Sequence, residues 1–179
     1  TSAGDYFTGL ELARELSERY RFECVFLPST TWYDLSDFDV AIAMVDGFKP
    51  SEITSCRSDI ILVAWIRNWF DRLLAFPEMN DFDAIWVSSE KAQHAFNSRF
   101  VQNVELIRIG TNADYFSAGS RVQEYTCDYC FTGSYFGSWR EIIGFLAPAS
   151  LPYEFALFGH GWNDVTWLEP YYRGPLPYS

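Results

Sequence analysis

Short apolar runs rich in Val, Ile and Phe recur along the chain, and this repetition constrains the fold more than any other feature. The runs cover residues 22–27, 40–45, 60–66, 84–87, 104–109, 129–132 and 154–158. Unbroken runs of this length are typical of strands that are buried on both faces of a parallel sheet. Between them, apolar residues recur at helical spacing over residues 6–19, from about residue 89 and from about residue 139. The alternation predicts an α/β fold with Rossmann-like, doubly wound parallel sheets.

The regular pattern is interrupted once, by a stretch without apolar period that contains Gly119 and Ser120. Such a stretch is typical of a linker, so we predict a first domain over 1–110, a linker over 111–126 and a second domain over 127–179. The chain starts with what looks like the loop and helix that follow a first strand, and it stops after two strands of the second domain. We therefore expect both domains to be incomplete in this sequence, with the first strand of the first domain missing.

Charge and composition argue against several classes of protein. The formal net charge is −11, from 13 basic and 24 acidic residues, which disfavours binding to nucleic acid or to an anionic membrane surface. No run approaches the roughly 18 apolar residues of a membrane-spanning helix, and the first residues lack the layout of a signal peptide. We therefore expect a cytoplasmic protein without a transmembrane segment. The four cysteines are expected to be reduced, with Cys127 and Cys130 on opposite faces of a strand.

Two nearly identical Asp-Phe-Asp segments, at residues 37–39 and 81–83, each come directly before an apolar run. We expect the aromatic ring to cover the edge of the sheet while the carboxylates remain in solvent. The Asp-x-Asp spacing can bind a metal ion where it follows a strand, at the edge of the sheet where ligands bind. Because both copies precede a strand, we predict no metal site.

Ligands of doubly wound sheets bind at the carboxyl ends of the strands, so the residues after each run are candidates for a site. Arg67 and Asn68 follow the third run together with two aromatic residues. This pair can orient a sugar acceptor or stabilise a leaving phosphate, although Arg67 can equally form an ion pair with Asp71 or another surface acid. After the fourth run, the hydroxyl of Ser88 or Ser89 can cap the following helix.

A glycine-containing loop that begins Gly133-Ser134 follows the sixth run. Ser138 and Glu141 have the spacing of a capping box, which predicts that a helix starts there. A helix amino terminus behind a glycine loop suits a phosphate group, and Arg140, expected in the first turn, would add a positive charge. The loop is therefore a candidate phosphate site.

A second glycine-bearing turn, Gly159-His160-Gly161, follows the seventh run. His160 can contact a nucleotide or the hydroxyls of a sugar from this position. A lone His beside a turn is also compatible with an ordinary surface residue, and both interpretations stay open. We include Gly159 and His160 among the candidate residues for binding a donor.

Several segments together resemble a known family. They are Gly4-Asp5 with the following helix, residues 65–69, 83–90 and 109–116, Phe131-Thr-Gly-Ser134 with Arg140, and residues 157–161. This combination resembles the "group 1" glycosyltransferases and looks closest to the branch of spore-maturation-type and bacterial surface-polysaccharide enzymes. The most specific segment is 109–116, which is similar to the family's Gly-x-(Asn/Asp)-x-Asp-x-Phe signature where the first domain leads into the second.

The resemblance implies a GT-B enzyme, with an amino-terminal acceptor domain, a carboxyl-terminal nucleotide-sugar domain and a cleft between them. Such an enzyme would transfer a sugar from a nucleotide-sugar donor to a glycan or lipid-linked acceptor in polysaccharide biosynthesis, with no cofactor and no obligatory metal. The resemblance is also compatible with peripheral association of the enzyme with a membrane. A sugar-nucleotide epimerase of the same fold and a non-catalytic sugar-binding module are the alternatives.

The resemblance also assigns residues. It places Gly133, Ser134 and Arg140 in the donor-pyrophosphate loop, Gly4 and Asp5 in a first-domain loop facing the cleft, and Arg67 and Asn68 where many relatives carry a catalytic or acceptor-contacting His. That His is absent here. The family's paired glutamates, which contact the donor sugar and ribose, would lie beyond Ser179, so we expect this chain to be inactive alone.

Overall fold

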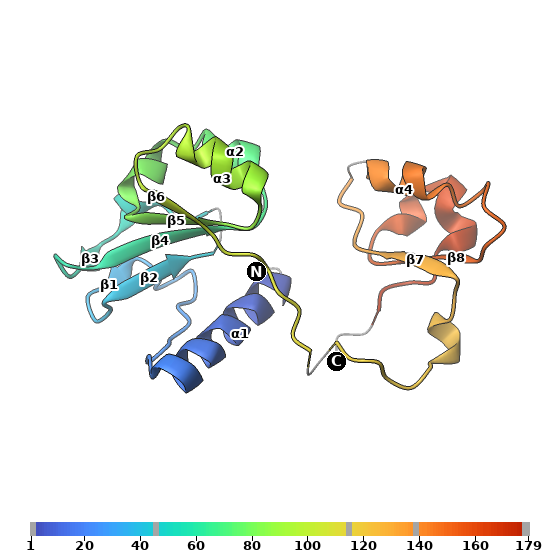
Figure 1. The fold of residues 1–179 in the computed structure, drawn as a ribbon, viewed down its shortest axis with the longest axis horizontal. Coiled ribbons are helices and arrows are strands. Elements are labelled where there is room, and N and C mark those ends of the chain that lie inside the picture. Colours follow the sequence, from blue (N-terminus) through green and yellow to red (C-terminus); the bar gives the residue numbers. More distant parts are fainter. Residues whose placement is uncertain (1–2, 45–46, 114–115, 138–139, 177–179) are drawn as a thin grey trace. The chain divides into compact units, whose positions relative to one another are not determined.

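The computed structural model divides the chain into two compact units, Thr1–Asn112 and Ala113–Ser179 (Figure 1). It describes residues 3–44, 47–113, 116–137 and 140–176. The division falls inside the predicted linker over 111–126, and the roles predicted for the two domains stay predictions. Each unit mixes helices with parallel strands, so the chain has an α/β fold.

A four-stranded parallel sheet forms the centre of the first unit. Its strands, in spatial order, are β2 (Val40–Ala43), β4 (Ile61–Ile66), β5 (Ala84–Val87) and β6 (Asn103–Leu106). A separate parallel pair is formed by β1 (Asp34–Leu35) and β3 (Ser55–Cys56). Neighbours in the four-stranded sheet follow one another in sequence, so each connection must cross over the sheet and return to its amino edge.

The core of the first unit lies around β4 and β5. Five consecutive residues of β4, from Leu62 to Ile66, are buried, and Ile85 and Val87 of β5 are inaccessible to solvent. The helices α2 (Phe70–Leu74) and α3 (Glu90–Asn97) lie side by side and cover one face of the sheet (Figure 1). These buried runs confirm the strands predicted from continuous apolar sequence.

The first helix, α1 (Ala3–Tyr20), confirms the helix predicted over residues 6–19. It ends at Arg21, whose backbone is left-handed with φ 61° and whose amide donates to the carbonyl oxygen of Ser17. The strand predicted over residues 22–27 is wrong, because this segment belongs to no sheet. Phe26 of this segment lies against the helix instead, with its ring 5.7 Å from that of Tyr6, while Phe22 and Val25 are exposed.

The strand predicted over residues 104–109 is shorter than expected, since β6 ends at Leu106. The neighbouring strand explains the difference. β5 ends at Val87, whose carbonyl oxygen accepts the last bond of the ladder from the amide of Ile107. Beyond Ile107 the chain has no strand to pair with, and Ile109 is exposed.

The second unit is built on the parallel pair β7 (Tyr129–Thr132) and β8 (Phe155–Phe158), joined through α4 (Glu141–Leu146). Its core contains Ile143, Phe155, Leu157, Trp162 and Leu168. Short 3-10 helices complete both units: η1 (Pro50–Glu52), η2 (Pro77–Asp81), η3 (Gln123–Tyr125), η4 (Trp162–Asp164) and η5 (Thr166–Tyr171). Within the described ranges, no helix combines the length and apolar character needed to span a membrane.

The start of α4 differs from the prediction. Arg140 has an extended backbone, with φ −104° and ψ 100°, and the first helical residue is Glu141. Arg140 therefore precedes the helix rather than lying in its first turn, and Glu141 cannot be the third helical residue that a capping box requires. The Arg140 carbonyl accepts the amide of Ile143, the buried residue of the helix, as expected of a residue at the capping position. Ser138 lies outside the described residues.

Candidate functional site

The residue that follows β4 forms a buried ion pair with the first turn of α1. The Nη2 atom of Arg67 donates to Oδ1 of Asp5 at 2.6 Å and to the carbonyl oxygen of Met44 at 3.2 Å. The Arg67 side chain is only 7% exposed. The structure thus brings together two predicted site residues that are far apart in sequence. The alternative expectation, that Arg67 forms an ion pair with an acidic residue, is also met, although the partner is Asp5 and not Asp71.

The surroundings of Arg67 leave little room for a ligand. Its guanidinium lies 5.4 Å from the centre of the Trp65 ring, and Nε of Arg67 and Nε1 of Trp65 are buried without a hydrogen-bond partner among the described residues. The adjoining cavity has a volume of about 30 Å³, which suits one water molecule or one ligand oxygen and is far too small for a sugar.

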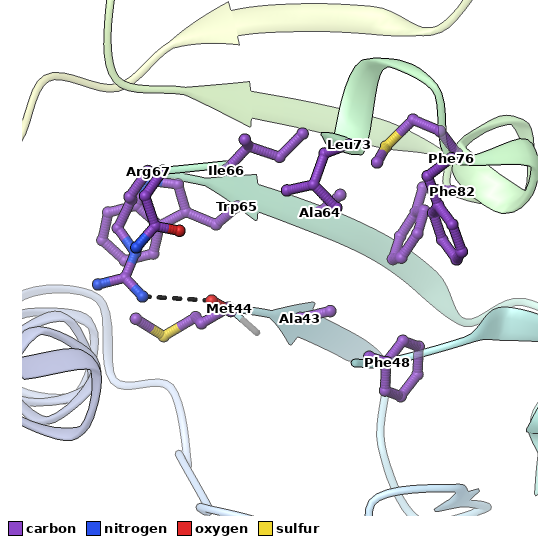
Figure 2. Close-up of a pocket in the computed structure, with 12 residues that line it drawn as sticks. Ala43, Met44, Phe48, Ala64, Trp65, Ile66, Arg67, Leu73, Phe76 and Phe82 are labelled. Carbon is purple, nitrogen blue, oxygen red and sulfur yellow. Dashed lines mark hydrogen bonds between the residues drawn. The ribbon is translucent and has the colours of Figure 1, made fainter. Parts of the chain in front are cut away.

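Figure 2 shows how this cavity runs along β4. Arg67, Trp65 and Met44 lie at the carboxyl ends of the strands, while Phe48 and Phe82 close the opposite end. The charge at the polar end comes from Arg67, which is already engaged. Asn68, the next residue, also lines the cavity and is exposed.

Gly4 and Asp5 lie in the first turn of α1 rather than in a loop. A carboxylate in the first turn of a helix interacts favourably with the helix dipole. Asp5 therefore has two structural reasons for its position: the helix amino terminus and the Arg67 guanidinium. The pair fixes the start of α1 against the carboxyl end of β4.

In the second unit, the two glycine turns meet at the carboxyl ends of the paired strands. The amide of Gly133 donates to the Phe158 carbonyl at 2.9 Å, and the amide of Tyr135 donates to the His160 carbonyl at 2.8 Å. The His160 amide in turn donates to the hydroxyl oxygen of Ser134 at 3.3 Å. Four of the residues predicted to bind a donor (Gly133, Ser134, Gly159 and His160) are thus brought together.

The close approach of these turns explains the glycine at position 159. Its φ of 135° is rarely adopted by other residues, and an added Cβ atom would lie 2.1 Å from the carbonyl oxygen of Gly133. Gly161 is constrained in the same way, with φ 82° and a Cβ position 2.6 Å from the Tyr135 carbonyl oxygen. The Gly133 carbonyl also accepts a hydrogen bond from Nε1 of the buried Trp162. The backbone of both turns is therefore held rigidly.

Arg140 is not joined to this cluster. Its side chain is exposed, and the contacts described for residues 116–137 and 140–176 do not link it to the glycine turns. His160 is exposed as well, with its imidazole in solvent. Any role of Arg140 at the turns therefore depends on a ligand that reaches both.

The Asp-Phe-Asp segments lie where predicted, at the edge of the sheet opposite the candidate site. Phe82 is buried and Phe38 is half-buried against the core, while the four carboxylates are exposed. Asp83 also accepts, through Oδ2, the amide of Leu62 at 2.7 Å, and its own amide donates to the Leu62 carbonyl. Among the described residues, no group of three or more His, Cys, Asp or Glu side chains is arranged to hold a metal ion.

The second unit repeats the same arrangement with Asp128, which the sequence reasoning did not single out. Asp128 accepts the amide of Glu154 at 2.7 Å and donates its own amide to the Glu154 carbonyl at 3.0 Å. The signal for it was available, because Asp128 precedes an apolar run directly, as Asp83 does.

The expectation that Cys127 and Cys130 face opposite sides is wrong. Burial raises the pKa of the Cys127 thiol, and the neighbouring Cys130 thiol raises it further through its charge and a hydrogen bond. Only Cys130 lies in β7; Cys127 precedes the strand and is separated from it by a bend at Asp128, so the alternation of a strand does not apply between them. A raised pKa keeps the Cys127 thiol protonated and less reactive at neutral pH.

Ser89 caps α3, which confirms the capping interpretation of the serines after β5. Its hydroxyl oxygen accepts the amide of Ala92 at 3.3 Å. We expect Ser89→Ala to lower the free energy of unfolding of the first unit by about 1 kcal/mol, because one amide of the first turn loses its acceptor. Urea unfolding followed by circular dichroism measures this change. Ser89→Asp keeps an acceptor and should retain the stability; an equal loss in both variants would contradict the capping role.

Comparison with models of protein families, with curated proteins and with solved structures gives no match to this chain. The interpretation of the site therefore depends on its own geometry. That geometry defines an α/β protein whose polar and glycine-bearing turns gather at the carboxyl ends of parallel strands, the edge at which such sheets bind ligands.

Proposed function

We propose that the chain is part of a GT-B glycosyltransferase that transfers a sugar from a nucleotide-sugar donor to a glycan or other acceptor. The observation that supports this most is the meeting of the Gly133–Ser134 and Gly159–His160 turns at the carboxyl ends of adjacent parallel strands. The small residues of these turns leave the ends of the two strands open, which is the edge at which doubly wound sheets bind their ligands. The resemblance to group 1 glycosyltransferases points to the same residues.

In this proposal the second unit binds the donor. The Ser134 oxygen accepts from the His160 amide, which leaves the hydroxyl proton to donate to a phosphate oxygen. The exposed imidazole of His160 and the exposed guanidinium of Arg140 would supply further donors. These groups would stabilise the negative charge that develops on the departing nucleoside diphosphate.

The first unit would serve the acceptor. Arg67 is a positioning residue here, because its guanidinium is buried and engaged by Asp5 and Met44. It holds the first turn of α1 beside the end of β4. The exposed amide of Asn68 is then the group that contacts acceptor hydroxyls.

Nuclear magnetic resonance tests the donor site directly, because the chain has only two histidines. We expect UDP, GDP or dTDP to shift the imidazole resonances of His160 and to leave those of His94, in the middle of α3, unchanged. His160→Ala should weaken binding of the best nucleotide about tenfold, the loss of one hydrogen bond to a charged group. His94→Ala is the matched control. Equal shifts of both histidines, or none with any nucleotide, would contradict the proposal.

Product analysis separates transfer from the two alternatives, and it requires a protein that also carries the family's paired glutamates, because we expect this chain to be inactive alone. A transferase consumes the sugar nucleotide only when an acceptor is present. An epimerase releases a new sugar nucleotide without an acceptor, and a non-catalytic module binds without turnover. Arg140→Ala should weaken donor binding if the guanidinium reaches the diphosphate, and normal turnover in that variant would remove Arg140 from the site.

A further inference from the structure

Trp69, at the start of α2, has no evident structural reason to be a tryptophan. Its backbone is left-handed, with φ 54° and ψ 34°, a region that is sterically unfavourable for bulky side chains. It occupies the capping position of the helix without making a side-chain capping bond. Its side chain is 63% exposed. Backbone preference would favour Gly or Asn here and capping would favour Ser or Asp, so a large exposed indole indicates a ligand.

The indole lines a groove between α2 and α3. The groove has a volume of about 500 Å³, within the range of roughly 300–1,000 Å³ that small-molecule sites occupy. The cavity beside Arg67, at about 30 Å³, is far smaller. The groove, unlike that cavity, has room for a sugar ring.

The charges along the groove are unusual for this chain. Arg72 of α2 and Lys91 of α3 line it, against one carboxylate, that of Asp71. The whole chain carries a net charge of −11, so a local excess of positive charge stands out. Lys91 also lies in the first turn of α3, where the helix dipole disfavours a cation unless an anion is nearby. The adjacent Glu90 is paired with Arg108.

The remaining lining is apolar or hydroxylic, with Leu74 and Ala92 on the helices and Ser89 at the capping position of α3. An aromatic face beside apolar groups suits the C–H face of a pyranose, and the cations suit a carboxylate or phosphate carried by that ring. A nucleobase would require several hydrogen-bonding groups at its edge, and Ser89 is the one hydroxyl of the lining. The chemistry therefore favours an acidic sugar.

We propose that the groove between α2 and α3 binds a negatively charged sugar residue, with Trp69 stacking on its ring and Arg72 and Lys91 binding its anionic group. The assignment of this sugar to the acceptor rests on the function proposed above. The binding itself does not, because all of the groups involved belong to the first unit.

Titration calorimetry with a hyaluronan tetrasaccharide, which carries glucuronic acid, tests the assignment, with maltotetraose as the neutral probe. We expect the acidic tetrasaccharide to bind at least several-fold more tightly. Trp69→Asn removes the ring but suits the left-handed backbone, so the fold should persist and affinity should fall about tenfold. Lys91→Gln should weaken binding about threefold and reduce its dependence on salt. Circular dichroism verifies folding of both variants.

Trp167→Ala is the matched control, because it removes an exposed indole from the second unit and should leave the affinity unchanged. Equal binding of the two tetrasaccharides would overturn the preference for an acidic sugar, and absence of binding would overturn the site. Competition by UDP that Trp69→Asn abolishes would reassign the groove to a nucleotide. The His160 resonances report on the second unit separately. UDP shifts at His160 without tetrasaccharide binding would therefore contradict the proposed groove site and leave the proposed donor site standing.

Discussion

Replacing Asp5 by Asn should lower the free energy of unfolding of the first unit by about 2 kcal/mol. The change leaves the Arg67 cation, whose side chain is 7% exposed, without its carboxylate partner, while the same nitrogen keeps its hydrogen bond to the Met44 carbonyl. Breaking a fully buried ion pair costs roughly 3–5 kcal/mol, and the smaller value reflects the 26% exposure of the Asp5 side chain. Urea unfolding, with hydrogen exchange of the α1 and β4 amides to assign the loss to this unit, measures the effect.

A double-mutant cycle sharpens this prediction. Arg67→Met removes the buried charge, so Asp5→Asn should cost much less in the Arg67→Met background than in the native chain. Glu18→Gln is the matched control, because it breaks an exposed pair with Arg14 and should have no measurable effect. Additive losses at positions 5 and 67 would show that the ion pair does not hold α1 to the sheet.

Gly159→Ala should have the larger effect, a loss of more than about 3 kcal/mol of stability in the second unit. The Cβ atom would overlap the Gly133 carbonyl oxygen at 2.1 Å, in addition to the strain at φ 135°. The two turns would have to separate, which would break the hydrogen bond between the His160 amide and Ser134. We therefore expect nucleotide binding to be lost together with stability, as measured by thermal unfolding and by the His160 resonances.

The control for this substitution is Gly137→Ala. Gly137 has φ 77°, but a Cβ atom there would meet nothing within 4 Å. It should cost only about 1 kcal/mol, the strain of a left-handed alanine. The difference between the two variants isolates the contact between the turns. Similar losses in both would mean that backbone strain alone accounts for the glycine at position 159.

The strands that were predicted well share one property. β4 is buried on both faces and β5 alternates buried with half-buried residues, so both occur as continuous apolar runs. The run at 22–27 has the same composition but packs on α1 through Phe26. An apolar run alone therefore specifies neither burial nor hydrogen-bonded pairing, since Phe22, Val25 and Phe26 are exposed. The start of α4 was misplaced because the spacing of a capping box is a short and common pattern, and the structure has Arg140, with an extended backbone, directly before the first helical residue.

The candidate site was predictable only in part. The rule that ligands bind at the carboxyl ends of strands selected Arg67, Gly133 and Gly159 from the sequence. It could not reveal that Asp5 would form an ion pair with Arg67, because the two residues are 62 positions apart in sequence and meet only in the folded chain. Nor could it distinguish Trp69 from a packing residue. The left-handed backbone and the exposure of its indole, which make it informative, exist only in the folded chain.

Asp83 and Asp128 each connect two parallel strands at their amino ends, because the carboxylate accepts a hydrogen bond from a backbone amide of the neighbouring strand. If one strand slipped by one residue against the other, this hydrogen bond would break and every side chain of that strand would turn to the wrong face. The alignment of the strands is thus secured at the edge farthest from the turns that follow them. Those turns can change their side chains during evolution without shifting the sheet, so their chemistry can diverge in descendants of this fold while its framework is inherited unchanged.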